Sequence, residues 1–128
     1  MTKSKLSLKI TTLNVRGLVS KLKRDKLCLW LKRHDIDITG IQETHCTKSK
    51  LISFKNSWRG LSLYDVTDSS HSRGVGILFH EKLDVQLDNF ECYNDGRAIV
   101  ANVRIGLKLF SVVNMYAPNQ IGNRIKRF

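Results

Sequence analysis

The sequence predicts an α/β sandwich-like fold in one domain, and three features carry this prediction. A strand, a basic helix and a second strand follow one another over residues 6–43, which is a βαβ-like unit of ordinary length. Further strands follow in meander order from residue 61 to residue 116. The 128 residues are 41% hydrophobic and 26% charged, which suits a single globular domain over residues 1–128.

The first strand is expected over residues 6–15, where apolar and polar residues alternate. Asn14 ends this alternation just before a turn at residues 15–18. Two interpretations of Asn14 are equally open. It is either a turn former ahead of Gly17 or an inward-facing polar side chain that needs a partner.

A basic helix is expected over residues 20–34, with Ser20 as its N-cap. Its apolar positions follow the i, i+3, i+4, i+7 spacing of a buried face: Leu27, Trp30, Leu31 and His34. A solvated face, or a surface that attracts backbone phosphate, is expected for its charged side chains: Lys21, Lys23, Arg24 and Lys32.

The second strand, over residues 36–42, leads directly into Glu43. Ligands of open α/β sheets bind at the carboxyl ends of the strands, so Asn14 and Glu43 converge if their strands are neighbours. A carboxylate in this place suits a hard cation such as Mg²⁺. The alternative is a surface glutamate at a strand end, because one acid alone makes no site.

The remaining chain is expected to be irregular over residues 44–60, with Trp58 anchored on the core. Five more strands are predicted after it, at residues 61–66, 74–79, 83–87, 99–105 and 108–116. The glycines at 74 and 76 indicate close approach of another backbone, and Gly106 begins a tight hairpin turn. His71 is expected in a solvated loop, and a basic helix is expected to begin at residue 120.

The charge balance favours a polyanionic partner. There are 22 Lys and Arg residues against 11 Asp and Glu residues, a formal net charge of +11. Nucleic acid is the first candidate and an acidic membrane surface the second. No apolar run is long enough to span a membrane, and the basic start lacks the apolar core of a signal peptide.

The cysteines predict a reducing compartment, the nucleus or the cytoplasm. Cys28, Cys46 and Cys92 are odd in number and too scattered for a disulfide framework or a zinc knuckle. All three thiols are therefore expected to be free.

Five short motifs, in this order, resemble the endonuclease/exonuclease/phosphatase superfamily: Thr12–Leu18, Ile41–His45, Gly74–Leu78, Gly96–Ala101 and Asn114–Asn119. The resemblance is strongest to the apurinic-endonuclease-like nuclease domain of LINE-type retrotransposon proteins, and it extends to exonuclease III. It implies the N-terminal half of a two-sheet α/β sandwich, a mixed sheet with flanking helices. It also implies a Mg²⁺-dependent DNA phosphodiesterase site at one edge.

The resemblance implies a role for each matching residue. Glu43 matches the metal-binding glutamate, and Asn14 matches the asparagine that organises the metal and the catalytic groups. Tyr116 matches the tyrosine that hydrogen-bonds the region of the scissile phosphate. Arg97 and Asn119 match positions near the DNA backbone.

The second half of the family pattern, with its Asp-x-Asn pair and its Asp-His pair, has no counterpart after residue 119. Two expectations follow for the chain as given: it does not cut DNA at a useful rate, and it is incomplete. Two other interpretations stay open beside an incomplete nuclease: a non-catalytic nucleic-acid-binding remnant of a retroelement protein, and a decayed gene product.

A chain that supplies roughly one sheet of a sandwich should leave an apolar face in water. Val75, Ile77, Val103 and Val113 are the residues expected on that face. Self-association through the exposed sheet face is therefore also expected, as is marginal stability.

Overall fold

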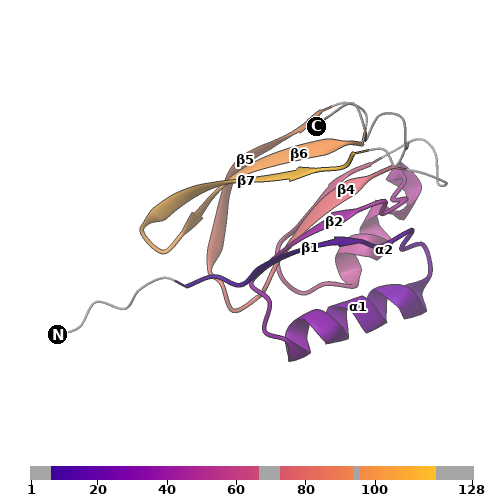
Figure 1. Cartoon of the computed structure of the whole chain (residues 1–128), viewed down its shortest axis with the longest axis horizontal. Helices are drawn as coiled ribbons and strands as arrows, with labels where there is room; N and C mark the ends of the chain where they lie inside the picture. The colour runs from indigo at the N-terminus through magenta and orange to yellow at the C-terminus, as the bar shows by residue number, and fades with distance from the viewer. Residues whose placement is uncertain (1–6, 67–72, 94–95, 118–128) are drawn as a thin grey trace, which may run out of the picture.

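The computed structural model describes residues 7–66, 73–93 and 96–117, which form two sheets packed face to face with helices below one of them (Figure 1). The strand order is β1-β2-β4-β3 in the four-stranded sheet and β5-β6-β7 in the three-stranded sheet. This is the mixed α/β sandwich with flanking helices that the sequence predicts.

The four-stranded sheet is built from β1 (Ile10–Asn14), β2 (Ile38–Gln42), β3 (Ser62–Asp65) and β4 (Val75–Phe79). The three-stranded sheet is built from β5 (Val85–Tyr93), β6 (Ala98–Ile105) and β7 (Lys108–Met115). The helical segments are α1 (Lys21–Arg33), the 3₁₀ turn η1 (Lys48–Lys50) and α2 (Leu51–Asn56).

The predicted βαβ unit is present. Strand β1 pairs in parallel with β2, and this register sets Asn14 beside Gln42. The carboxyl ends of both strands therefore lie at the same edge of the sheet. The first strand begins at Ile10, later than the alternation from residue 6 predicts, and residues 1–6 lie outside the described part.

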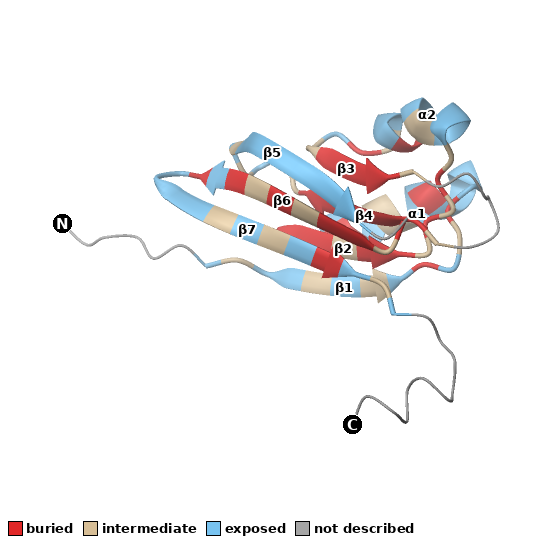
Figure 2. Cartoon of the chain, turned by 90° about the horizontal axis from the view of Figure 1, so that it is seen from above, coloured by how far each residue is buried: buried red, intermediate tan, exposed pale blue. Residues whose placement is uncertain are grey.

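The two sheets bury each other, which corrects the expected exposed face. Val75, Ile77 and Val103 are almost fully buried in the core between the sheets. The reason is that β5, β6 and β7 do not extend the first sheet but form a second one that lies over it (Figure 2). Val113 points the other way, and it is 56% exposed on the outer face.

Helix α1 begins as predicted but packs on a different face. The Ser20 side chain caps the helix by accepting a hydrogen bond from Lys23 N. The face toward the core follows the same helical spacing three positions earlier than expected: Arg24, Leu27, Cys28 and Leu31. Trp30 is 43% exposed and stacks on His34 instead of entering the core.

The segment expected to be irregular contains η1 and α2, which is a further correction. Helix α2 has only six residues and no side-chain cap, so its sequence carries few helix signals, yet its Phe54 is fully buried. Trp58 anchors the segment as predicted, because its indole Nε1 donates to the carbonyl of Phe79 at 2.8 Å.

The hairpin between β6 and β7 turns at Gly106, which has a φ of 62°. The face of β7 that turns toward the other sheet carries Phe110, Val112, Asn114 and Tyr116, which is the opposite face from the one that the expectation for Val113 required. A Cβ at position 76 would lie 2.9 Å from the ring of Tyr64 and 3.1 Å from the Leu63 carbonyl oxygen, so a side chain approaches this glycine slightly more closely than the backbone that the sequence predicted. The residues His71, Asn119 and 120–128 lie outside the described residues.

Neither helix in the described part of the chain is long and apolar enough to cross a membrane. Cys28, Cys46 and Cys92 are all free, as the sequence predicts. Burial raises the pKa of the Cys46 thiol to about 12.

Candidate functional site

Asn14 and Glu43 meet at the edge where β1 and β2 end. The Asn14 amide nitrogen Nδ2 donates to the Glu43 carboxylate oxygen Oε2. The Asn14 Oδ1 accepts from the backbone N–H of Arg16 at 3.0 Å. Asn14 therefore does both things that the sequence left open: it forms the turn, and it binds Glu43.

The backbone fixes the position of Glu43 tightly. Its φ of 56° lies in the left-handed region, which is uncommon for a residue other than glycine. The Glu43 carbonyl accepts from Gly17 N at 2.6 Å, and the next carbonyl, that of Thr44, accepts from Leu18 N at 3.0 Å. The Thr44 N–H donates to the carbonyl of Gly74 at 3.0 Å. Two other chain segments, at Gly17–Leu18 and at Gly74, thus hold the loop that carries the glutamate.

Tyr116 joins this pair from the other sheet. Its backbone N–H donates to the Arg97 carbonyl at 2.7 Å, directly after β7 ends. The pKa of Tyr116 is raised, first by partial burial, then by the negative charge of Glu43 and a hydrogen bond with it. The positive charges of Arg97 and Arg73 oppose this rise. An amide, a carboxylate and a phenol from three strand ends therefore meet at one place.

Arg97 lies beside this group, at the entry to β6. Its side chain is half-buried, and its Nε has no hydrogen-bond partner within the described ranges. Because its charge acts on the Tyr116 phenol, the guanidinium belongs to the same edge of the molecule. Asn119 cannot be placed, since it lies outside the described residues.

His45 fills space next to the site. Its ring atom Nδ1 would lie 2.7 Å from a Cβ at Gly17, so the ring packs against that turn. Gly17 has a φ of 90°, which a residue with a side chain rarely adopts. His45 thus occupies the loop position that the sequence predicted for it.

A polar network behind the site was missed by sequence reasoning. Asn114 is buried between the sheets, and its Nδ2 donates to the carbonyls of Ile41 at 2.9 Å and Gly76 at 2.8 Å. Its Oδ1 accepts from Gln42 Nε2 at 2.7 Å. A Cβ at Gly40 would lie 3.0 Å from the Asn114 amide carbon. The sequence signal that could have revealed this network is the alternation of β7, which puts Asn114 on the same face as Phe110 and Val112, together with the glycine at position 40 of β2 that leaves room for its amide.

The donor atoms suit a cation that takes most of its ligands from water and phosphate. The described part of the chain has no group of three or more His, Cys, Asp or Glu side chains placed to share a metal ion. Mg²⁺ usually binds one or two carboxylates together with waters and substrate phosphates. Glu43, which is held by Asn14, supplies one such carboxylate.

Comparison with known proteins gives matches to a family model and to a transposon protein. Residues 11–124 match the family model described as "Endonuclease/Exonuclease/phosphatase family". The chain is also 24% identical, over 123 residues, to the "Transposon TX1 uncharacterized 149 kDa protein" of Xenopus laevis. That match covers 96% of this chain and 9% of the relative.

Solved structures share the fold. A humanized D. rerio TDP2 aligns with a TM-score of 0.67 at 20% identity, covering 94% of this chain and 54% of that chain. The AP endonuclease LMAP of Leishmania major aligns with a TM-score of 0.65 at 16% identity, covering 93% and 43%. An AP endonuclease of Archaeoglobus fulgidus aligns with a TM-score of 0.59 at 28% identity, covering 88% and 42%. The chain therefore spans about half the length of the structures it matches.

Proposed function

Because the chain belongs to the Endonuclease/Exonuclease/phosphatase family, we propose that it supplies one part of the active-site edge of a Mg²⁺-dependent DNA phosphodiesterase. We further propose that this phosphodiesterase is of LINE-type retroelement origin, which the similarity to a transposon protein supports. The observation that carries the proposal is the meeting of Asn14, Glu43 and Tyr116 at one edge of the sandwich.

Each residue has a distinct part in this proposal. Glu43 would hold the Mg²⁺ ion, which when bound neutralises negative charge on a phosphate. Asn14 fixes the carboxylate by its hydrogen bond. The Tyr116 phenol is protonated at neutral pH, as tyrosine ordinarily is, so it would donate a hydrogen bond to a phosphate oxygen. Arg97 adds a positive charge at the same edge.

DNA binding follows from the charge of the chain. The net charge is +11, and four lysines of α1 are exposed: Lys21, Lys23, Lys26 and Lys32. Contacts between lysines and phosphates release counterions, so the logarithm of the DNA affinity should fall linearly with the logarithm of the salt concentration. The affinity should depend little on the DNA sequence. Among the structural neighbours, a D. rerio TDP2 was solved with a single-strand DNA product. The basic residues at 124–127 lie outside the described part.

We propose that residues 1–128 do not cut DNA at a useful rate by themselves and form part of a larger catalytic domain. General acid–base groups typically contribute about 10²- to 10⁴-fold to such a reaction. This edge has a carboxylate, an amide and a phenol, and within the described residues Glu43 is not part of any group of three or more His, Cys, Asp or Glu side chains that could hold a metal ion. The groups of a catalytic unit lose their effect together when part of the unit is missing.

Nicking of supercoiled plasmid tests the proposal. The chain is assayed with and without Mg²⁺, alone and mixed with a polypeptide that carries the second half of the family pattern. We expect Mg²⁺-dependent nicking only from the mixture. Glu43→Gln should abolish that nicking, whereas the control Glu81→Gln, which neutralises an exposed glutamate away from the site, should not.

Two outcomes contradict the proposal in different ways. Efficient nicking by residues 1–128 alone, lost in Glu43→Gln, refutes incompleteness. Nicking by the mixture that survives Glu43→Gln refutes the site. Salt-dependent DNA binding without nicking in any arm supports the second candidate, a non-catalytic nucleic-acid-binding remnant, which the +11 charge favours.

A further inference from the structure

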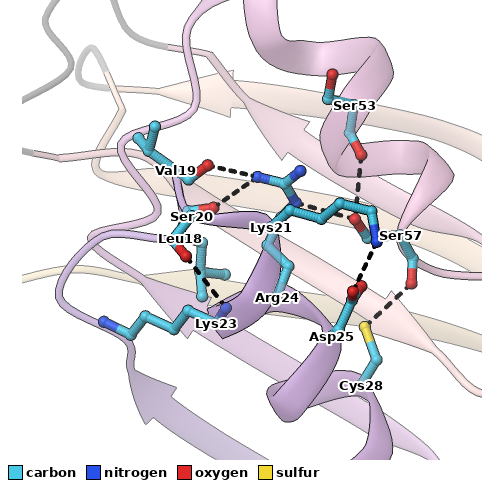
Figure 3. Close-up of polar contacts among 10 residues, drawn as sticks. All are labelled: Leu18, Val19, Ser20, Lys21, Lys23, Arg24, Asp25, Cys28, Ser53 and Ser57. Atoms are coloured by element: carbon cyan, nitrogen blue, oxygen red, sulfur yellow. Dashed lines mark hydrogen bonds and ion pairs between the residues drawn. The ribbon is translucent and has the colours of Figure 1, made fainter.

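A polar hollow of about 320 Å³ lies between the N-terminal half of α1 and α2 (Figure 3). Its lining residues are Lys21, Arg24, Asp25, Ser53, Asn56 and Ser57. The hollow has room for a phosphate group together with several waters. None of these side chains has a part in the function proposed above beyond the general charge of α1.

Arg24 forms the inner wall of this hollow. Only 7% of the residue is exposed. Its Nη1 donates to the carbonyls of Leu18 at 3.0 Å and Val19 at 2.8 Å, and its Nε donates to Ser57 Oγ at 2.9 Å. The guanidinium carbon lies 4.8 Å from the ring centre of Phe54. These contacts fix the guanidinium rigidly in one place (Figure 3).

The charge of Arg24 lacks an anionic partner in the described part of the chain. All of its hydrogen-bond acceptors are neutral, and the nearest acid in sequence, Asp25, pairs with Lys21 at 2.7 Å. Within the described residues the Arg24 Nη2 makes no hydrogen bond, and it is not among the fully buried side-chain atoms that lack a partner. Arg24 also lines the hollow, where its remaining N–H groups are the donors that it can offer. Buried charges in proteins are normally paired, so this one is suited to an anion.

Other donors surround the same space. The Ser53 hydroxyl and the Asn56 amide form no side-chain hydrogen bond within the described residues, and both line the hollow. The Lys21 side chain extends across the hollow, with its ammonium next to Asp25 (Figure 3). Two cations and one carboxylate leave a formal charge of +1 on the lining. The arrangement matches the several acceptor oxygens of one phosphate.

The hollow adjoins the candidate active site through a single residue. Leu18 accepts from Arg24 with its carbonyl and donates to the Thr44 carbonyl with its N–H, and Thr44 directly follows Glu43. We propose that the hollow between α1 and α2 binds a phosphodiester group of the nucleic-acid strand, next to the group held at Glu43. This inference rests on the proposed function, because it takes the nucleic-acid strand from there.

The proposal is tested by titrating isotopically labelled chain with a single-stranded oligonucleotide and, separately, with inorganic phosphate. Backbone amide shifts at residues 53–57 report binding in the hollow. The double variant Ser53→Ala/Asn56→Ala removes two donors. Its matched control, Asn102→Ala/Ser111→Ala, removes the same two residue types from the outer face of the three-stranded sheet. Circular dichroism checks that both variants keep the fold.

We expect oligonucleotide to shift the amides of residues 53–57, and the Ser53→Ala/Asn56→Ala variant to bind it about tenfold more weakly than the control does. Lys21→Gln should lower the salt slope by about one unit more than Lys108→Gln, which removes an equal charge from an exposed position at the start of β7, outside the hollow.

Each other outcome overturns the inference. If phosphate shifts residues 53–57 and oligonucleotide does not, the hollow takes a free anion and no strand. If oligonucleotide binds with residues 53–57 unperturbed, the hollow is excluded while the proposed DNA binding stands. If oligonucleotide does not bind at all, both proposals fail.

Discussion

The ionisation of one phenol reports on the candidate site at the scale of single residues. Glu43→Gln removes the negative charge that raises the pKa of Tyr116, so this pKa should fall toward 10.0. It should stay above that value, because partial burial, the largest cause of the rise, remains. Spectrophotometric titration, taken as the difference between each protein and its Tyr116→Phe variant, measures the shift.

Glu91→Gln is the matched control. In the wild-type protein the Glu91 carboxylate accepts a hydrogen bond from Tyr93 and raises the pKa of that phenol, not the pKa of Tyr116. The substitution removes this carboxylate. A Tyr116 pKa that responds to Glu91→Gln, or does not respond to Glu43→Gln, contradicts the described contact.

The raised pKa of Tyr116 also fixes the direction in which stability changes with pH. Because the pKa of Tyr116 is higher in the folded than in the unfolded protein, this group stabilises the fold below pH 10.0. The stabilisation is lost as the pH rises through the folded-state pKa.

Sequence reasoning reached some of these residues and missed others for a physical reason. Asn14 and Glu43 could be paired because parallel neighbours bring their carboxyl ends to one edge, which is a short-range deduction from a βαβ pattern. The burial of Arg24 could not be deduced. It depends on two loop carbonyls and on Ser57, which is 33 residues away in sequence. The metal and phosphate roles remain predictions.

At the scale of elements, Asn114 joins β7 to β2 and β4. Asn114→Ala would leave the carbonyls of Ile41 and Gly76 and the amide of Gln42 without this partner inside the core. We expect the variant to lose about 2–4 kcal/mol of unfolding free energy, because unsatisfied buried groups cost about 1–3 kcal/mol each and partly relax. Urea denaturation followed by circular dichroism measures the loss.

Asn102→Ala serves as the control for this prediction. Asn102 lies on the neighbouring strand β6, but its partners Asn89 and Ser111 are exposed, so its loss should change stability by less than about 1 kcal/mol. Equal losses in the two variants would show that the inter-sheet contacts of Asn114 carry no special stability.

The elements themselves were predictable where their pattern was long. The helix near Ser20 and the β6–β7 hairpin carry caps, turns and periodicity that local sequence reveals. Helix α2 does not, because six residues without a capping side chain give too little periodicity. Alternation shows which residues share a face of a strand, but not whether a meander extends one sheet or begins another.

At the scale of the whole molecule, the outer face of the three-stranded sheet is open to water. Leu109, Val113 and Met115 of β7 are 66%, 56% and 68% exposed, and β7 is also an edge strand. Exposed apolar strands at a sheet edge favour pairing with another chain. We predict that the protein self-associates with rising concentration, and more strongly at high salt, because salt screens the repulsion between chains of charge +11.

Sedimentation velocity at low and high salt checks this prediction. Val113→Lys places a charge within the apolar face and should shift the protein toward monomer at every concentration. Ser49→Lys adds the same charge to an exposed position of η1 and should have a smaller effect. A wild-type protein that stays monomeric throughout, or equal effects of the two variants, contradicts the assignment of this face.

The left-handed backbone at Glu43 bears on the history of the sequence. A non-glycine residue held there stores roughly 1–3 kcal/mol of strain that glycine would release. A lineage that drifts under selection for folding alone therefore gains by exchanging this glutamate for glycine. Natural proteins keep such unfavourable residues where activity depends on them, in a trade-off against stability. Under the proposed function Glu43 would be such a residue, and its role rests on the proposed metal contact, because the left-handed backbone is shared by Arg16, Asp35, His45 and Arg73.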